Sequence, residues 1–168
     1  MTVNRKVARL APRDYIGRHS YFLTICCERR APHLREPATA QRIIALLQEC
    51  AAGHDFLLHA YCLMPDHAHV LVEGTHERCD LREFVRLFKQ RSSFAFRKSH
   101  RRAFWEMSYY DHILRPGDQL EDVACYIWWN PVRKGLSLRP EEFAYSGSQT
   151  IDWMKRSATG TSWRAPWK

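Results

Sequence analysis

The segment "YCLMPDHAHVLV", residues 61–72, places His67 and His69 two positions apart within an apolar run. Side chains alternate across a β-strand, so both imidazoles would lie on one face while Ala68 and Val70 point to the other. Two neighbouring imidazoles on one face can bind a single metal ion. The same spacing also fits two surface or hydrogen-bonded histidines, so both interpretations stay open on spacing alone.

A second group of chemically capable residues lies in "CYIWWNP", residues 125–131, where Tyr126 and Asn130 are four positions apart. On a helix this spacing puts both side chains on one face. A tyrosine hydroxyl can act as a covalent nucleophile, and an asparagine carbonyl is a hard oxygen ligand for Mg²⁺ or Mn²⁺. Pro131 disfavours helical dihedrals at Asn130. The alternative is therefore a core tyrosine followed by a helix-ending Asn-Pro.

Periodicity and punctuation predict the elements that would carry these residues. Capping-box spacing occurs twice, at Asp80 with Glu83 and at Asp118 with Glu121. The pattern predicts an α+β fold whose antiparallel sheet has helices on one face and leaves its other face open as a platform for a site. The expected strands are 20–28, 56–65, 67–74 and 103–115, and the expected helices are 36–53, 80–98 and 118–136.

Length and composition favour one domain. The chain has 168 residues, is 45% hydrophobic and contains no Gly/Ser linker. We expect a basic N-terminal arm over 1–18, a core over 19–136 and a C-terminal extension over 137–168. No apolar run approaches the roughly 18 residues of a membrane span, and the N-terminus lacks a signal-peptide core. A cytoplasmic protein with no membrane partner is expected. The six cysteines form no CxxC pair, so reduced thiols are predicted.

The charge balance indicates a polyanionic partner. Lys and Arg number 26 against 18 acidic residues, a formal net charge of +8. Basic side chains gather in the N-terminal arm and in the second expected helix, with aromatic residues near the latter, which suits a phosphate backbone with bases to stack. A solvated helix face and a free tail would give the same composition. The candidate DNA contacts are Arg5, Lys6, Arg9, Arg13, Lys89, Arg91, Arg97 and Lys98.

Three segments taken together resemble a known family. "YCLMPDHAHVLV", "FWEMSYYDHILR" and "YIWWNPVRKGL" stand in the order of the signature blocks of the REP-associated tyrosine transposases, a branch of the HUH single-strand DNA transposases. The resemblance runs from about Tyr21 to about Tyr145. It implies a ferredoxin-like or RRM-like fold of the HUH-endonuclease type. It also implies that His67 and His69 bind a divalent metal, Mg²⁺ or Mn²⁺, that Asn130 completes the metal shell, and that Tyr126 is the nucleophile.

The resemblance further implies metal-dependent cleavage and strand transfer of single-stranded DNA at REP-like hairpins. In that reaction Tyr126 would attack a phosphodiester and leave a 5′-phosphotyrosine and a free 3′-hydroxyl. The expected location is the nucleoid region of the cytoplasm. Related transposases include dimers and monomers, so a homodimer stays open. Two positions depart from the family pattern: Glu106 stands where relatives often carry Gln, and Tyr145 stands near a usual Trp.

Two other function classes fit parts of the sequence. A non-catalytic nucleic-acid-binding module would use the basic, aromatic sheet as a stacking platform and would treat Tyr126 as a core residue. A zinc hydrolase would need a third ligand beside the two histidines, and His59, Asp66 and Cys62 are the nearest candidates. The pair Asp111 and His112 could orient the sheet or touch the site, and we expect the structural role. A covalent protein–DNA adduct that Tyr126→Phe abolishes separates these classes from the transposase.

Overall fold

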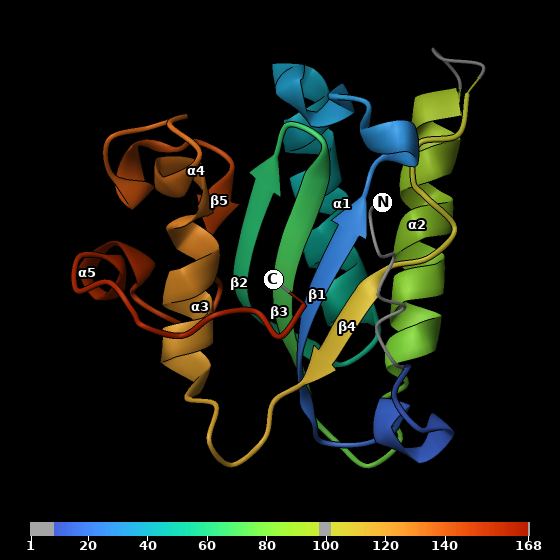
Figure 1. Cartoon of the computed structure of the whole chain (residues 1–168). Coiled ribbons are helices and arrows are strands. Elements are labelled where there is room, and N and C mark those ends of the chain that lie inside the picture. The colour runs from blue at the N-terminus through green and yellow to red at the C-terminus, as the bar shows by residue number, and fades with distance from the viewer. Residues whose placement is uncertain (1–8, 98–101, 168) are drawn as a thin grey trace, which may run out of the picture.

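A five-stranded antiparallel sheet forms the centre of the computed structural model, which describes residues 9–97 and 102–167. The strand order is β4-β1-β3-β2-β5, with the long β2–β3 hairpin beside β1 (Figure 1). Apolar and β-branched residues dominate the three central strands, and nearly every position in them is buried. The strands are β1 (Ser20–Cys26), β2 (Phe56–Met64), β3 (His67–Gly74), β4 (Tyr110–Ile113) and β5 (Ser146–Gly147).

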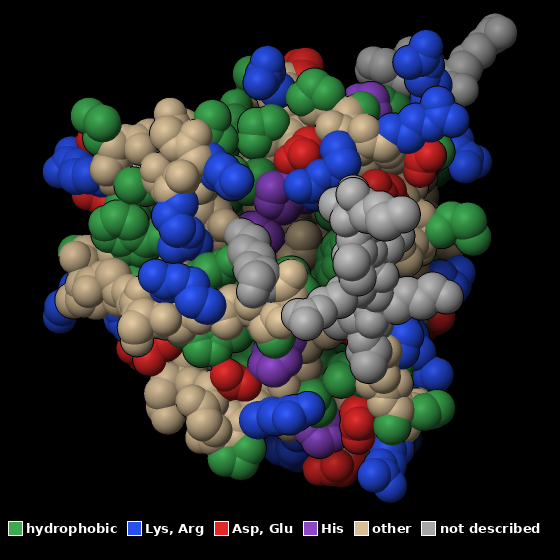
Figure 2. Space-filling model, in the orientation of Figure 1, with side chains coloured by type: hydrophobic (Ala, Val, Ile, Leu, Met, Phe, Trp, Pro, Cys, Tyr) green, Lys and Arg blue, Asp and Glu red, His purple; other side chains and the backbone are tan. Residues whose placement is uncertain are grey.

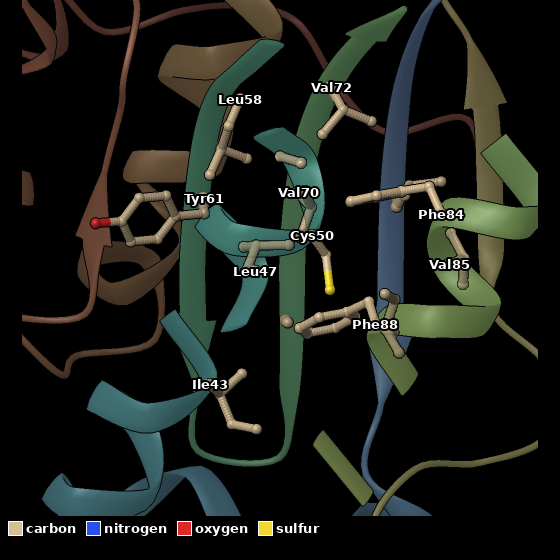
Figure 3. Close-up of a cluster of buried hydrophobic side chains, with 14 of the residues drawn as sticks. Ile43, Leu47, Cys50, Leu58, Tyr61, Val70, Val72, Phe84, Val85 and Phe88 are labelled. Atoms are coloured by element: carbon tan, nitrogen blue, oxygen red, sulfur yellow. The ribbon is translucent and has the colours of Figure 1, made fainter. Parts of the chain in front are cut away.

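Two long helices, α1 (Pro37–Gly53) and α2 (Leu81–Arg97), cover one face of the sheet. Their apolar stripes pack on Leu58, Val70 and Val72 of the hairpin (Figure 3). Each helix has a side-chain cap. The Glu36 carboxylate accepts hydrogen bonds from the first free N–H groups of α1, and the Asp80 carboxylate does the same for α2. The helical residues of this core include Ile43, Leu47, Cys50, Phe84, Val85 and Phe88.

The other face of the sheet carries α3 (Leu120–Trp128), α4 (Asn130–Arg133) and α5 (Trp153–Ser157). A second apolar cluster forms there between α3 and the outward side chains of the central strands, among them Phe22, Cys62 and Leu71. The chain after α5 then crosses in front of the sheet (Figure 1). Short 3₁₀ helices complete the fold: η1 (Pro12–Tyr15), η2 (Glu28–Arg30), η3 (His33–Arg35) and η4 (Pro140–Glu142).

The predicted α+β class, the antiparallel sheet, the hairpin and the first two helices are confirmed, with boundaries within about two residues. All six cysteines are buried and free. No helix in the part of the chain described here is long and apolar enough to cross a membrane.

Several expectations are corrected. The helices do not share one face, because α3 lies opposite α1 and α2. The strand expected over 103–115 is limited to β4, and Trp105 makes only an isolated bridge to Cys27. The helix expected over 118–136 breaks at Trp129, because Pro131 has no N–H to continue it. Asp118 does not cap this helix, because the N-cap position falls on Gln119. The short strand β5 was not predicted.

Gly74 at the end of β3 gives a prediction about stability. A Cβ atom there would lie 2.3 Å from the Gly17 carbonyl oxygen and 2.8 Å from Cβ of Cys79, closer than real atoms approach. Gly74→Ala should therefore lower the free energy of unfolding by roughly 1–3 kcal/mol, the usual range for overpacking. Gly53→Ala is the matched control, because nothing lies within 4 Å of its Cβ position. Equal urea midpoints for both variants would contradict the prediction.

Candidate functional site

His67 and His69 occupy the start of β3 on the face that also carries α3. Their Nε2 atoms lie 3.1 Å apart, with the two rings at 83° to each other. Ala68 and Val70 point into the core under α1 and α2, as strand alternation predicted. Histidine atoms are visible near the middle of this face, with basic and acidic side chains beside them (Figure 2), and His69 itself is buried. The structure thus brings the two histidines together.

The outer nitrogen of each ring is held by a neighbour. The Asp66 carboxylate lies 2.6 Å from Nδ1 of His67, and the Thr24 hydroxyl lies 2.8 Å from Nδ1 of His69. A proton on Nδ1 of His67, facing the carboxylate, leaves a lone pair on its inner nitrogen. Two nitrogens that bind one ion at about 2.1 Å and 90° are about 3.0 Å apart. The pair therefore fits a divalent metal ion.

The ligands proposed for a zinc hydrolase are engaged elsewhere. His59 is held between Glu73 and Thr150, both at 2.7 Å, and Asp66 faces the outer side of His67. Burial raises the pKa of the Cys62 thiol to about 12, so it stays protonated at neutral pH. Within residues 9–97 and 102–167, no cluster of three or more His, Cys, Asp or Glu side chains is arranged to hold a metal. This donor set does not favour a zinc hydrolase.

Tyr126 lies on α3 and faces the same side of the sheet, where only 1% of its surface is exposed. Phe22 of β1 contacts both parts of the site. Its ring centroid is 5.9 Å from that of Tyr126 and 5.5 Å from that of His69. The guanidinium of Arg133 stacks on the tyrosine ring, 4.3 Å from the centroid, and also donates to the Tyr126 carbonyl. Aromatic and cationic contacts thus hold the tyrosine ring against Phe22, the residue that also contacts His69.

Asn130 is the first residue of α4 and is buried. Its side-chain amide donates to the Tyr126 carbonyl at 3.0 Å and to the Ile127 carbonyl at 3.2 Å, so it closes the open end of α3. The four-residue spacing therefore does place Asn130 against Tyr126. Metal binding by its side-chain oxygen remains a prediction.

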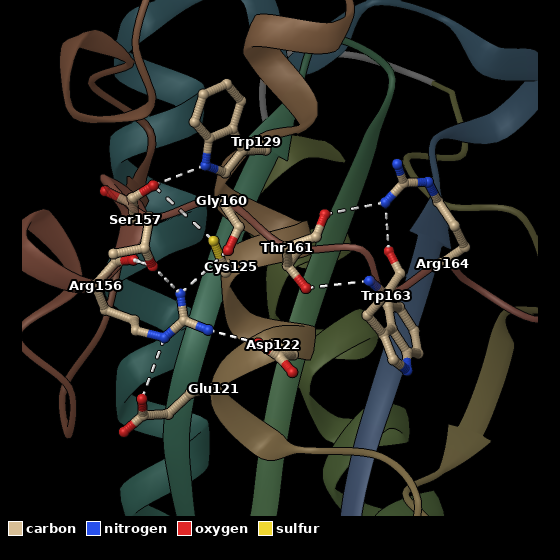
Figure 4. Close-up of polar contacts among 11 residues, drawn as sticks. Glu121, Asp122, Cys125, Trp129, Arg156, Ser157, Gly160, Thr161, Trp163 and Arg164 are labelled. Carbon is tan, nitrogen blue, oxygen red and sulfur yellow. Dashed lines mark hydrogen bonds and ion pairs between the residues drawn. The ribbon is translucent and has the colours of Figure 1, made fainter.

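The C-terminal segment, residues 158–167, covers the tyrosine. Trp163 packs edge-to-face on the ring of Tyr126 at 5.1 Å, and its indole N–H donates to Asp118 at 2.8 Å. Trp167 stacks on Phe22 at 5.0 Å. The preceding Arg156 anchors this segment through ion pairs with the first turn of α3 (Figure 4). Tyr126 is therefore closed off from solvent by the chain itself.

The pair Asp111 and His112 has structural partners. Asp111 accepts a hydrogen bond from Tyr15 at 2.6 Å, on the α2 side of the sheet. His112 contacts Asp118 at 2.8 Å. Burial raises the pKa of the Asp118 carboxyl, but hydrogen bonds from Arg115, Trp163 and His112 outweigh it and hold the pKa below its usual range. A charged Asp118 thus holds both the end of β4 and the indole of Trp163.

The candidate DNA-contact residues differ in their exposure and in their partners within the chain. Arg97 and the exposed ring of Phe94 line a shallow hollow on α2. The Lys89 ammonium is half-buried and donates to the carbonyls of Glu106 and Met107, and burial lowers its pKa. Arg91 pairs with Glu49, Arg9 pairs with Asp111, and Arg13 is largely exposed near Asp14. The remaining three, Arg5, Lys6 and Lys98, lie outside the described residues.

Three partners of the site were missed or misread in the sequence. Thr24 became visible only through its register opposite His69 in the β1–β3 ladder. Asp66 was considered only as a third ligand, although an acidic residue directly before a metal-binding histidine is also suited to hold its outer nitrogen. Arg133 stands seven positions after Tyr126, a two-turn spacing that could have suggested a shared helix face.

Comparisons with known proteins show which family model and which relatives the chain resembles. The model of the family described as "Transposase IS200 like" matches residues 16–129. A Haemophilus influenzae protein provisionally named REP-associated tyrosine transposase is 24% identical over 147 residues, covering 80% of this chain and 82% of that protein.

Two solved structures share the fold. One is a REP-associated tyrosine transposase bound to a REP hairpin, with a TM-score of 0.70 and 20% identity over 84% of this chain and 81% of that chain. The other is a provisionally named transposase from Deinococcus radiodurans R1, with a TM-score of 0.51 and 21% identity over 64% and 88% of the two chains. With the family match spanning more than half of its length, the chain belongs to the IS200-like transposase family.

Proposed function

We propose that this chain is a tyrosine transposase that cleaves and rejoins single-stranded DNA at REP-like hairpins, with Tyr126 as the nucleophile. The observation that carries the proposal is the arrangement of one face of the sheet. The inner nitrogens of His67 and His69 converge there to 3.1 Å, and Phe22 contacts both this pair and Tyr126. The hairpin-bound relative with the same fold supports the choice of substrate.

The residues have distinct roles in the proposed reaction. The Tyr126 oxygen forms a bond to phosphorus while the bond from phosphorus to the 3′-oxygen breaks. The phenol proton passes to solvent, and the departing 3′-oxygen takes up a proton. A phenol with an ordinary pKa of about 10 is a weak nucleophile at neutral pH. A Mg²⁺ or Mn²⁺ ion held by His67, His69 and Asn130 would supply the Lewis acidity that activates the scissile phosphate.

The phosphotyrosine bond conserves the energy of the broken phosphodiester. A second 3′-hydroxyl can therefore attack the same phosphorus and release Tyr126, so no nucleotide cofactor is required for rejoining. This suits strand transfer better than hydrolysis. The net charge of +8 supports a polyanionic substrate.

The test is a covalent adduct assay. Purified protein is incubated with labelled hairpins made from the palindromic repeats that flank its gene, with Mg²⁺, Mn²⁺ or EDTA, and read on a denaturing gel. We expect a metal-dependent adduct that disappears in Tyr126→Phe and in His67→Ala. Tyr145→Phe is the matched control, because Tyr145 lies in the chain leading to β5 and packs on the opposite core.

Tight hairpin binding without any adduct would contradict this proposal. It would favour the non-catalytic binding module instead, with Tyr126 as a core residue.

A further inference from the structure

Arg30 lies beside the histidine pair and has no role in the reaction described above. Its Nε lies 3.0 Å from an oxygen of the Asp66 carboxylate in an ion pair, and its Nη1 donates to the Cys26 sulfur at 2.8 Å. The other oxygen of the same carboxylate holds Nδ1 of His67 at 2.6 Å. One carboxylate thus joins the guanidinium to a metal-binding candidate.

The sheet register confirms that these groups share one face. Cys26 of β1 is directly opposite His67 of β3, and Thr24 is opposite His69. Opposite residues of an antiparallel pair project to the same side. Arg30 therefore reaches back over the strand that borders the histidine pair, on the face that also carries Tyr126.

The backbone that places Arg30 is strained. Arg29 and Arg30 have φ angles of +53° and +57°, a region in which non-glycine residues are uncommon. Such backbone strain is concentrated at functional sites. Here the strained turn redirects the chain after β1, so that the guanidinium points back towards Cys26 and Asp66.

The guanidinium also keeps capacity for a further ligand. An arginine has five N–H groups, and the two contacts of Arg30 with described residues engage Nε and Nη1. About half of the side chain, 51%, is exposed to solvent. A planar guanidinium suits phosphate oxygens, to which it can donate two parallel hydrogen bonds.

We propose that Arg30 is a further catalytic residue, which binds the phosphodiester attacked by Tyr126 through the free edge of its guanidinium. This inference rests on the proposed function. Arg30 stays protonated while the bond from the Tyr126 oxygen to phosphorus forms and the bond to the 3′-oxygen breaks. Its charge stabilises the extra negative charge on the phosphate oxygens in the transition state, where a fixed donor has its largest effect.

A purely positioning role makes a different prediction. If Arg30 only holds Asp66, and through it His67, its loss would weaken Mn²⁺ binding in the absence of DNA. A catalytic role would leave the metal affinity nearly unchanged and lower the rate of adduct formation.

The experiment uses the full chain with Arg30→Gln, Arg30→Lys and the control Arg29→Gln. The control removes one charge from the neighbouring residue, which shares the positive φ and whose side chain is 91% exposed. Mn²⁺ affinity is measured by electron paramagnetic resonance of the free ion, without DNA. The rate of adduct formation is measured in single turnovers at saturating Mn²⁺ on the flanking-repeat hairpins.

We expect Arg30→Gln to slow adduct formation by roughly 10²–10³-fold, the effect of removing one transition-state donor. Arg30→Lys should fall between this variant and the wild type, because it keeps the charge and loses the planar fork. Arg29→Gln should stay within about twofold, and Mn²⁺ affinity within about threefold, in all variants. An unchanged rate in Arg30→Gln would overturn the proposal, as would a rate loss that disappears once Mn²⁺ is saturating.

A binding measurement separates this inference from the proposed function. If the wild type forms no adduct, the proposed function is contradicted. The role of Arg30 in binding phosphate is then tested by the hairpin affinity alone. In the Tyr126→Phe background, Arg30→Gln should remove most of the additional hairpin affinity that Mn²⁺ provides, and Arg29→Gln should not. Equal Mn²⁺-dependent affinity in both variants would overturn the role of Arg30.

Discussion

A chain that ends at Gly160 is expected to form the Tyr126 adduct at least about tenfold faster than the full chain. The reason is the cover over the nucleophile: Trp163 packs on the tyrosine ring, and Trp167 stacks on Phe22 beside it. Each aromatic pair contributes about 0.5–1.5 kcal/mol beyond the area that it buries. Loss of about 1.4 kcal/mol from the covered state raises the open fraction about tenfold.

Two variants make this result interpretable. Trp163→Ala removes the contact with Tyr126 and the hydrogen bond to Asp118 without shortening the chain, so it should also accelerate the reaction. Arg164→Ala is the control within the same segment, because among the described residues its side chain donates only to the backbone carbonyls of Thr161 and Trp163. Arg156 remains in all three proteins and keeps α5 tied to α3. Unchanged adduct rates in both the truncated chain and Trp163→Ala would show that the segment does not limit access.

The histidine pair could be predicted because its information is local. Strand alternation depends only on the neighbouring residues, so the "HAH" triplet fixed the shared face of His67 and His69 before any contact was known. The boundaries of β3, His67–Gly74, agree with the apolar run. The first two helices were predictable for the same reason, since apolar residues at helical spacing define both and Asp80, the cap of the second, lies directly before its apolar stripe.

The surroundings of the pair depend on contacts between distant segments and could not be read in this way. Trp163 reaches Tyr126 across 37 positions of sequence, and Thr24 reaches His69 across 45. The positive φ angles at Arg29 and Arg30 carry no sequence signal, because neither residue is glycine or asparagine. The position of α3 was mispredicted for a related reason. Its apolar stripe could pack on either face of the sheet, and only the second cluster around Phe22 decides between them.

His69→Ala is expected to have the largest effect on metal binding. It removes one of the two converging nitrogens, so Mn²⁺ affinity should fall by more than the 10–100-fold that loss of an outer partner typically costs. Thr24→Val tests the outer partner. It keeps the shape of a buried side chain and deletes the hydroxyl that contacts Nδ1 of His69, so a loss of about tenfold is expected. Mn²⁺ titration of the DNA-free protein measures both.

The changes in Mn²⁺ affinity in His69→Ala and Thr24→Val distinguish a metal site from a structural histidine pair. Thr24 contacts neither Arg30 nor Tyr126 in the described interactions, so a reduced Mn²⁺ affinity in Thr24→Val must act through His69. If the two histidines only stabilised the fold, the wild type would bind Mn²⁺ weakly. Both variants would then lower the free energy of unfolding and leave this weak Mn²⁺ affinity unchanged. Thr24→Ser supplies the control, because it restores the hydroxyl and loses only a methyl group. Recovery of Mn²⁺ affinity in Thr24→Ser would show that the hydrogen bond to the outer nitrogen orients His69 towards the ion.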